Sequence, residues 1–147
     1  MHAMASKKIK RLALSICLAL GSILPAGAEE FLPLSDVREG MHGYAKTVVH
    51  GTKIDTFDVD VLGIMKNKGS AGGDLVLVKV SGPLIDETGG IAQGMSGSPI
   101  LQNGRLVGAV THVLVNDPTR GYGIFAQTML EQAKNAVQNG AEAQTAE

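Results

Sequence analysis

Residues 89–113 read GGIAQGMSGSPILQNGRLVGAVTHV, a glycine-rich loop followed by two apolar runs. The pair Asn103-Gly104 separates the two runs, and both residues tolerate the positive φ angles of a two-residue turn. The stretch therefore predicts a β-hairpin whose turn sets the register of one strand against the other. Ser98 and the strand pattern after it exclude the G-x-S-x-G elbow of α/β-hydrolases, in which a helix follows the nucleophile.

The segment before this hairpin shows strand periodicity. Residues 43–51 and 53–65 are rich in Val, Ile, Thr and Phe, which predicts two strands joined near Gly51. Residues 66–74 consist largely of lysine, glycine and other polar residues and predict an exposed loop. Residues 75–82 are almost continuously apolar, as expected of a mostly buried strand.

After the hairpin the pattern changes from strand to helix. Residues 117–123 have turn composition, and residues 122–126 predict a short last strand. The apolar spacing from residue 127 to 139 suits an amphipathic helix that ends at Gly140. Residues 141–147 are expected to form a disordered tail.

The first 28 residues predict a secretory signal peptide. Four basic residues precede an apolar run, and Ala26-Gly27-Ala28 fits a cleavage site of small residues. We expect cleavage after Ala28 and a secreted or periplasmic location. An uncleaved anchor is the alternative, but the run is shorter than the roughly 20 residues that span a bilayer. We therefore expect no stable membrane anchor in the mature chain.

Cleavage after Ala28 would change the composition of the chain. Loss of four basic residues takes the formal net charge from −1 to about −5, which argues against a nucleic-acid partner. The single cysteine, Cys17, would also be lost, so that neither a disulfide nor a thiol nucleophile remains. About 119 residues would be left, enough for one domain over residues 29–140.

Ser96 allows two interpretations. A serine nucleophile needs an exposed oxygen, a nearby base, and backbone N–H groups where negative charge develops. Gly94 and Gly97 would let the chain turn tightly, so that the N–H groups of Gly94 and Ser96 face one oxyanion pocket. In the other interpretation Ser96 is a solvated turn residue, and the G-x-S-G motif alone does not decide between them.

The run TGGIAQGMSGSPILQNGRLVGAVTHVLVNDPTRGYGIF resembles the signature region of the SpoIVB-type serine peptidases, family S55. The close likeness covers roughly residues 87–125, and a looser one reaches back to residue 33. The region is also similar to the second β-barrel of trypsin-like enzymes. The resemblance implies a mainly β fold: one trypsin-like barrel, which we expect to contain about six or seven strands, with a C-terminal α-helix.

The resemblance also implies functional roles. Ser96 would be the nucleophile, Gly94 and Ser96 would supply the oxyanion N–H groups, and residues 108–113 would border the substrate pocket. The implied activity is that of a serine endopeptidase acting on a peptide or protein substrate without a cofactor.

The chain departs from the family pattern in the other catalytic groups. The pattern takes its general-base histidine from an upstream first barrel, and we find no corresponding segment here. Its acidic partner falls at Ser81, with Asp86 nearby as a candidate substitute. Without a base, serine is a poor nucleophile. We therefore expect the base to come from another histidine of this chain or from a histidine-bearing partner chain.

Among the histidines, His112 is the best placed in sequence, one strand beyond Ser96. It is a candidate base, with pocket lining as the alternative. His42 and His50 are expected to be exposed strand or turn residues. No histidine pair has metal spacing, and we expect no metal site.

Two functional classes remain open. The first is a secreted S55 serine peptidase that cleaves peptide bonds through Ser96. The second is a catalytically silent, truncated domain of the same fold that binds an extended peptide or a partner chain along a strand edge. A hydrogen bond between Ser96 and an imidazole would favour the first class.

Overall fold

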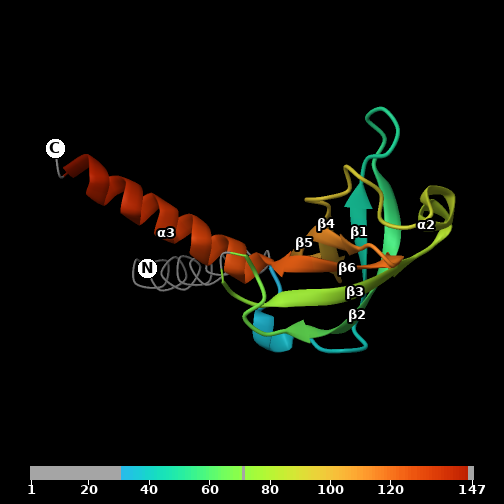
Figure 1. The fold of residues 1–147 in the computed structure, drawn as a ribbon, viewed down its shortest axis with the longest axis horizontal. Helices are drawn as coiled ribbons and strands as arrows, with labels where there is room; N and C mark the ends of the chain where they lie inside the picture. Colours follow the sequence, from blue (N-terminus) through green and yellow to red (C-terminus); the bar gives the residue numbers. More distant parts are fainter. Residues whose placement is uncertain (1–30, 71, 146–147) are drawn as a thin grey trace, which may run out of the picture.

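The computed structural model describes residues 31–70 and 72–145, which form a β-barrel followed by a long helix (Figure 1). The expected signal peptide, residues 1–28, lies outside the described residues. Within the described part, no helix is both long and apolar enough to cross a membrane.

Six antiparallel strands close the barrel in the order β1-β2-β3-β6-β5-β4. The strands are β1 His42–Thr47, β2 Asp55–Met65, β3 Leu75–Ser81, β4 Pro99–Gln102, β5 Arg105–Leu114 and β6 Asp117–Phe125. The helical elements are the 3₁₀ helix η1 Leu34–Asp36, the short helix α2 Pro83–Thr88 and the C-terminal helix α3 Ala126–Thr145. The predicted trypsin-like β-barrel with a C-terminal helix is confirmed.

The inward faces of the strands fill the barrel with apolar side chains. On β2, Phe57, Val59 and Val61 are buried, while Asp58 between them is exposed. This alternation follows from the two-residue period of a strand. Asp58 and Asp60 therefore lie on the outer face of the barrel, whereas Asp55, at the start of the strand, is on the side of Phe57 and pairs with Lys53.

The hairpin predicted around Asn103-Gly104 is present. Asn103 has φ 50° and Gly104 has φ 78°, the positive values that a type I′ turn requires. Gln102 lies opposite Arg105 at the end of the β4–β5 ladder, so the turn contains two residues. Strand β4, which follows Ser96, is therefore joined by this tight turn to β5 and pairs with it.

The prediction for residues 117–123 is wrong, because these residues belong to β6. The reversal comes earlier, between Leu114 and Asp117, which are paired across the β5–β6 hairpin. Pro118 is tolerated there because the β3–β6 ladder begins only at Arg120, so this end of β6 is an edge. Pairing with β5 has overridden the turn composition of the segment.

The predicted helix end at Gly140 is also wrong, since α3 continues to Thr145. An interior glycine costs about 1 kcal/mol relative to alanine, but alanines follow it in the sequence and alanine is the best helix former. Residues 141–145 of the expected tail are therefore helical. Helix α3 extends away from the barrel (Figure 1).

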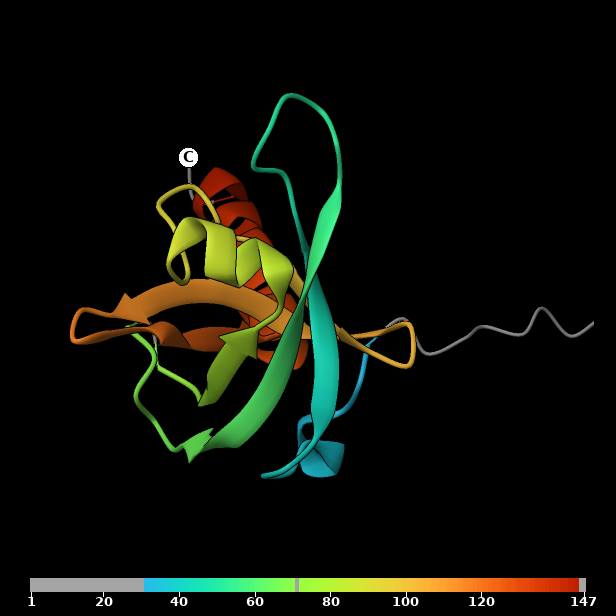
Figure 2. The same cartoon turned by 90° about the vertical axis from the view of Figure 1, so that its right-hand side faces the viewer.

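The sequence reasoning did not anticipate helix α2. Its boundaries carry a recognisable signal, because Pro83 occupies the first turn and Gly89 ends the helix with φ 73°. Figure 2 shows α2 and the β1–β2 connection, residues 48–54, at the same end of the barrel. Helix α2 leads directly into the loop that carries Ser96.

Candidate active site

The loop of residues 89–98 is anchored at both its start and its centre. The Ile91 N–H donates to the carbonyl oxygen of Pro118 at 2.8 Å, and a side chain at Gly90 would collide with the Pro118 backbone. Met95 is only 2% exposed, and its sulfur accepts the Ala92 N–H at 3.3 Å. The packing of Met95 therefore holds the turn that presents Ser96.

The backbone N–H groups around Ser96 fall into two sets. The N–H groups of Met95, Gly97 and Ser98 donate to carbonyl oxygens within 2.7–3.1 Å. Within the described residues, the N–H groups of Gly94 and Ser96 donate to no protein acceptor. Gly94 has φ 96°, a conformation that favours glycine. The two N–H groups expected to bind an oxyanion are thus both left available, as is the N–H of Gln93 just before them.

Ser96 is exposed, and its Oγ lies 3.4 Å from the carbonyl oxygen of Thr111, to which it donates. No histidine of the described part forms a hydrogen bond with Ser96. Because a backbone carbonyl cannot take up the hydroxyl proton, this contact does not activate the serine.

His112 forms its hydrogen bond elsewhere. Its Nδ1 lies 3.0 Å from the Thr111 hydroxyl, which in turn donates to the carbonyl oxygen of Tyr122 at 3.1 Å. The Thr111 hydroxyl therefore lies within hydrogen-bond distance of both the His112 ring and the Tyr122 carbonyl oxygen. The structure thus places His112 on β5, next to the Thr111 that contacts Ser96, without a hydrogen bond to Ser96 itself.

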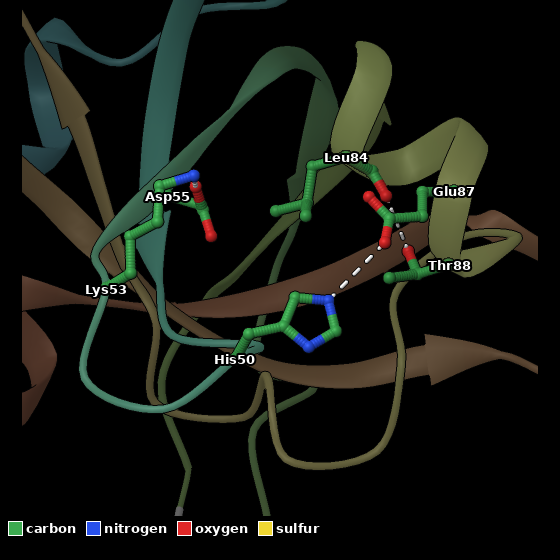
Figure 3. A network of polar contacts seen from close by, with 6 residues as sticks. All are labelled: His50, Lys53, Asp55, Leu84, Glu87 and Thr88. Carbon is green, nitrogen blue, oxygen red and sulfur yellow. Dashed lines mark hydrogen bonds and ion pairs between the residues drawn. The ribbon is translucent and has the colours of Figure 1, made fainter.

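His50 contacts a carboxylate that the sequence reasoning missed. His50 Nε2 lies 3.4 Å from Glu87 Oε1, so the β1–β2 connection contacts helix α2 (Figure 3). Asp86, the candidate acidic partner, is exposed, and the structure joins it to no histidine of the described residues. Nothing in the local sequence indicates the His50–Glu87 contact, because the two residues are 37 positions apart.

His42 is held on the outer face of β1 and β2. Its Nδ1 lies 2.8 Å from Asp60, and its Nε2 lies 3.9 Å from Asp58. The hydrogen bond with Asp60 raises the pKa of His42 above the usual value of 6.5. The described residues contain no group of three or more His, Cys, Asp or Glu side chains that could hold a metal ion.

A cavity of about 560 Å³ lies along the same strand as Thr111. Residues 111–113 of β5 form one wall, and the 66–74 loop, β6 and α3 supply others. Of residues 108–113, which the resemblance implies at a substrate pocket, only Thr111, His112 and Val113 line this cavity.

The family model for the SpoIVB peptidase S55 matches residues 28–130 of this chain. The chain belongs to the SpoIVB peptidase family S55. The match includes the Ser96 loop and the whole barrel, so the S55 assignment covers the site described above. No curated protein matches the chain.

The S55 chain resembles crystal structures of Rv3671c from Mycobacterium tuberculosis. The inactive form of a serine-to-alanine mutant has a TM-score of 0.55 at 13% identity, covering 71% of this chain and 51% of that one. The active form of the Rv3671c protease has a TM-score of 0.53 at 14% identity, covering 69% and 45%. The S55 chain therefore spans about half the length of this protease, and at such low identity the likeness shows the fold alone.

Proposed function

We propose that this chain is the nucleophile-bearing domain of a secreted SpoIVB-type serine peptidase, in which Ser96 attacks the substrate. The observation that carries the proposal is the pattern of N–H groups around Ser96. Only the N–H groups of Gly94 and Ser96 are left available in residues 94–98, next to an exposed hydroxyl. An oxyanion site requires this combination.

The proposed chemistry is acyl transfer. Ser96 Oγ would attack the carbonyl carbon of a peptide bond while a base accepts the hydroxyl proton. The N–H groups of Gly94 and Ser96 would stabilise the negative charge on the carbonyl oxygen. The C–N bond then breaks, the base returns the proton to the leaving amine, and water hydrolyses the acyl-enzyme.

Among the residues that the structure describes, no base contacts Ser96. In the structure, Ser96 donates to Thr111, while His112 and His50 contact Thr111 and Glu87. We therefore propose that the base is a histidine supplied by a partner chain, and that the isolated domain reacts slowly. The proposed location is secreted or periplasmic, with a peptide or protein as the substrate.

A second candidate function is peptide binding without catalysis. It is favoured by the edge of β5, because the β4–β5 ladder ends at the pair Pro99–Ala109. Residues 111–113 have no strand neighbour on that side within the described part of the chain. An extended peptide would add a strand there whether or not Ser96 reacts.

Fluorophosphonate labelling of the purified chain tests the proposal. We expect slow labelling at Ser96 that free imidazole accelerates, because imidazole supplies the missing base in solution. Ser96→Ala should abolish the labelling. If imidazole leaves the rate unchanged, the second candidate function is favoured. Rapid labelling without imidazole that His112→Ala abolishes would instead make His112 the base.

N-terminal sequencing of the exported protein tests the proposed secretion. The mature chain should begin at Glu29, directly after the small residues of the cleavage site. Recovery of the intact N-terminus in the membrane fraction would contradict it.

A further inference from the structure

We infer that the cavity beside β5 receives one apolar side chain of the peptide that binds at Ser96. The inference rests on the proposed function, because it assumes that a peptide lies along β5. It adds the chemical class of a residue that the site would select.

The cavity has the composition of a site for an organic group. Its volume of about 560 Å³ lies within the roughly 300–1,000 Å³ common for ligand pockets. Lys68, Ser70, Thr111, His112 and Gln132 also line it, but most of its wall is apolar. The larger apolar side chains are Met65, Leu75, Val113, Tyr122 and Ile124.

The register of β3 against β6 explains this apolar wall. The valines of β3 point into the barrel, so its leucines Leu75 and Leu77 face outward. Leu75 lies opposite Ile124, and Leu77 lies opposite Tyr122. A strand that is apolar on both faces normally packs against other elements on both faces. Here the outer face is covered only in part, since three of these four residues line the cavity.

The open edge of β5 connects this cavity to Ser96. Thr111 accepts the hydrogen bond from Ser96, and residues 111–113 all line the cavity. Ser96 and the cavity therefore share Thr111, and the cavity wall continues along β5 to Val113, about 10 Å of extended strand. A peptide paired with this edge would direct every second side chain to one face, so one of them would be aimed at the cavity.

The charge at the cavity restricts its occupant further. Lys66 forms an ion pair with Asp74 at 2.7 Å, but Lys68, which lines the cavity, has no ion-pair partner within the described residues. A lysine or arginine side chain entering the cavity would meet this positive charge in an apolar surrounding. We therefore expect leucine or phenylalanine to be preferred over lysine.

A positional-scanning peptide library tests the inference. The protein is the full chain carrying Ser96→Ala, which prevents cleavage. The probes are fluorescein-labelled, C-amidated hexapeptides in which one position at a time is Leu, Phe, Asp or Lys, with binding followed by fluorescence anisotropy. At one position of the hexapeptide, peptides with Leu or Phe should bind at least about tenfold more tightly than the peptide with Lys, because an apolar side chain is buried there.

Cavity-filling variants locate this preference. Ile124→Trp and Val113→Trp should each reduce it to less than about threefold, because indole would occupy the space. Thr56→Trp is the matched control, since Thr56 is an exposed residue near the opposite end of β2 from Met65. Circular dichroism identifies any variant that does not fold. If one filling variant is unfolded, the peptide preference of the other filling variant tests the inference.

The outcomes separate the inference from the proposed function. Absence of binding, absence of any positional preference, or a preference that survives in a folded filling variant would overturn the inference. If the preference is lost on filling but Ser96 resists labelling even with imidazole, the proposed peptidase function fails and the cavity remains a peptide-binding site.

Discussion

The hydroxyl of Ser96 donates a hydrogen bond to the backbone carbonyl oxygen of Thr111, 3.4 Å away. This contact joins the glycine-rich loop to the open edge of β5. A peptide N–H arriving at that edge would compete for the same carbonyl oxygen. The proposed nucleophile and the proposed peptide-binding strand therefore share one acceptor.

Ser96→Ala should leave the stability of the domain nearly unchanged. Ser96 is exposed and its hydrogen bond is long, so we expect a change in unfolding free energy of less than about 0.5 kcal/mol. Urea unfolding followed by circular dichroism measures this change. A loss above about 1 kcal/mol would show that the hydroxyl has a structural role.

Met95→Ala should destabilise the domain by about 2–5 kcal/mol, because Met95 is 2% exposed and belongs to the apolar core. The matched control is Met95→Leu, which conserves volume and should cost less than about 1.5 kcal/mol. Denaturant midpoints for the three proteins provide the comparison. Equal midpoints for Met95→Ala and the parent chain would contradict the anchoring role of this side chain.

Gly104→Val should destabilise the β4–β5 hairpin by about 1 kcal/mol or more. Gly104 has φ 78°, which a β-branched residue resists. No atom lies within 4 Å of the added Cβ, so the cost would come from backbone strain alone. Asn103→Gly is the control, because glycine accepts the φ of 50° at that position. The thermal midpoint of Gly104→Val should fall below that of the control.

His42 should titrate above pH 6.5, because its hydrogen bond with Asp60 stabilises the imidazolium. A folded-state pKa above the unfolded value means that this pair stabilises the fold below about pH 6.5. Its contribution is lost as the pH rises through the folded-state pKa. Histidine NMR titration measures the shift, which Asp60→Asn should largely remove. An unchanged His42 pKa in that variant would assign the shift to another group.

Features that depend on a few neighbouring residues could be predicted from the sequence. The hairpin at Asn103-Gly104 follows from the φ values that these two residues tolerate. The barrel face of β2 follows from the alternation of Phe57 and Val59 with aspartates. The glycine-rich loop marked Ser96 as the candidate nucleophile, and the longer run of about residues 87–125 that contains it carried the resemblance to the S55 family.

Features that depend on distant residues required the tertiary structure. Strand β6 begins at Asp117 because β5 pairs with it, and that pairing outweighs a local turn preference. The partner of His50 is Glu87, 37 positions away, on a helix that the periodicity did not reveal.

The hydrogen bonding of the proposed nucleophile, Ser96, likewise depends on residues that are distant in the sequence. Sequence placed Ser96 in its loop, but which groups contact its hydroxyl depends on how the barrel closes. Closure brings Thr111, 15 residues away, against Ser96 and leaves His112 bonded to the Thr111 side chain. The sequence therefore pointed to Ser96 as the proposed nucleophile, while tertiary packing decided that no histidine of the described residues is hydrogen-bonded to it. The physical reason is that a hydrogen bond forms only over about 3 Å, a distance set by packing and not by sequence spacing.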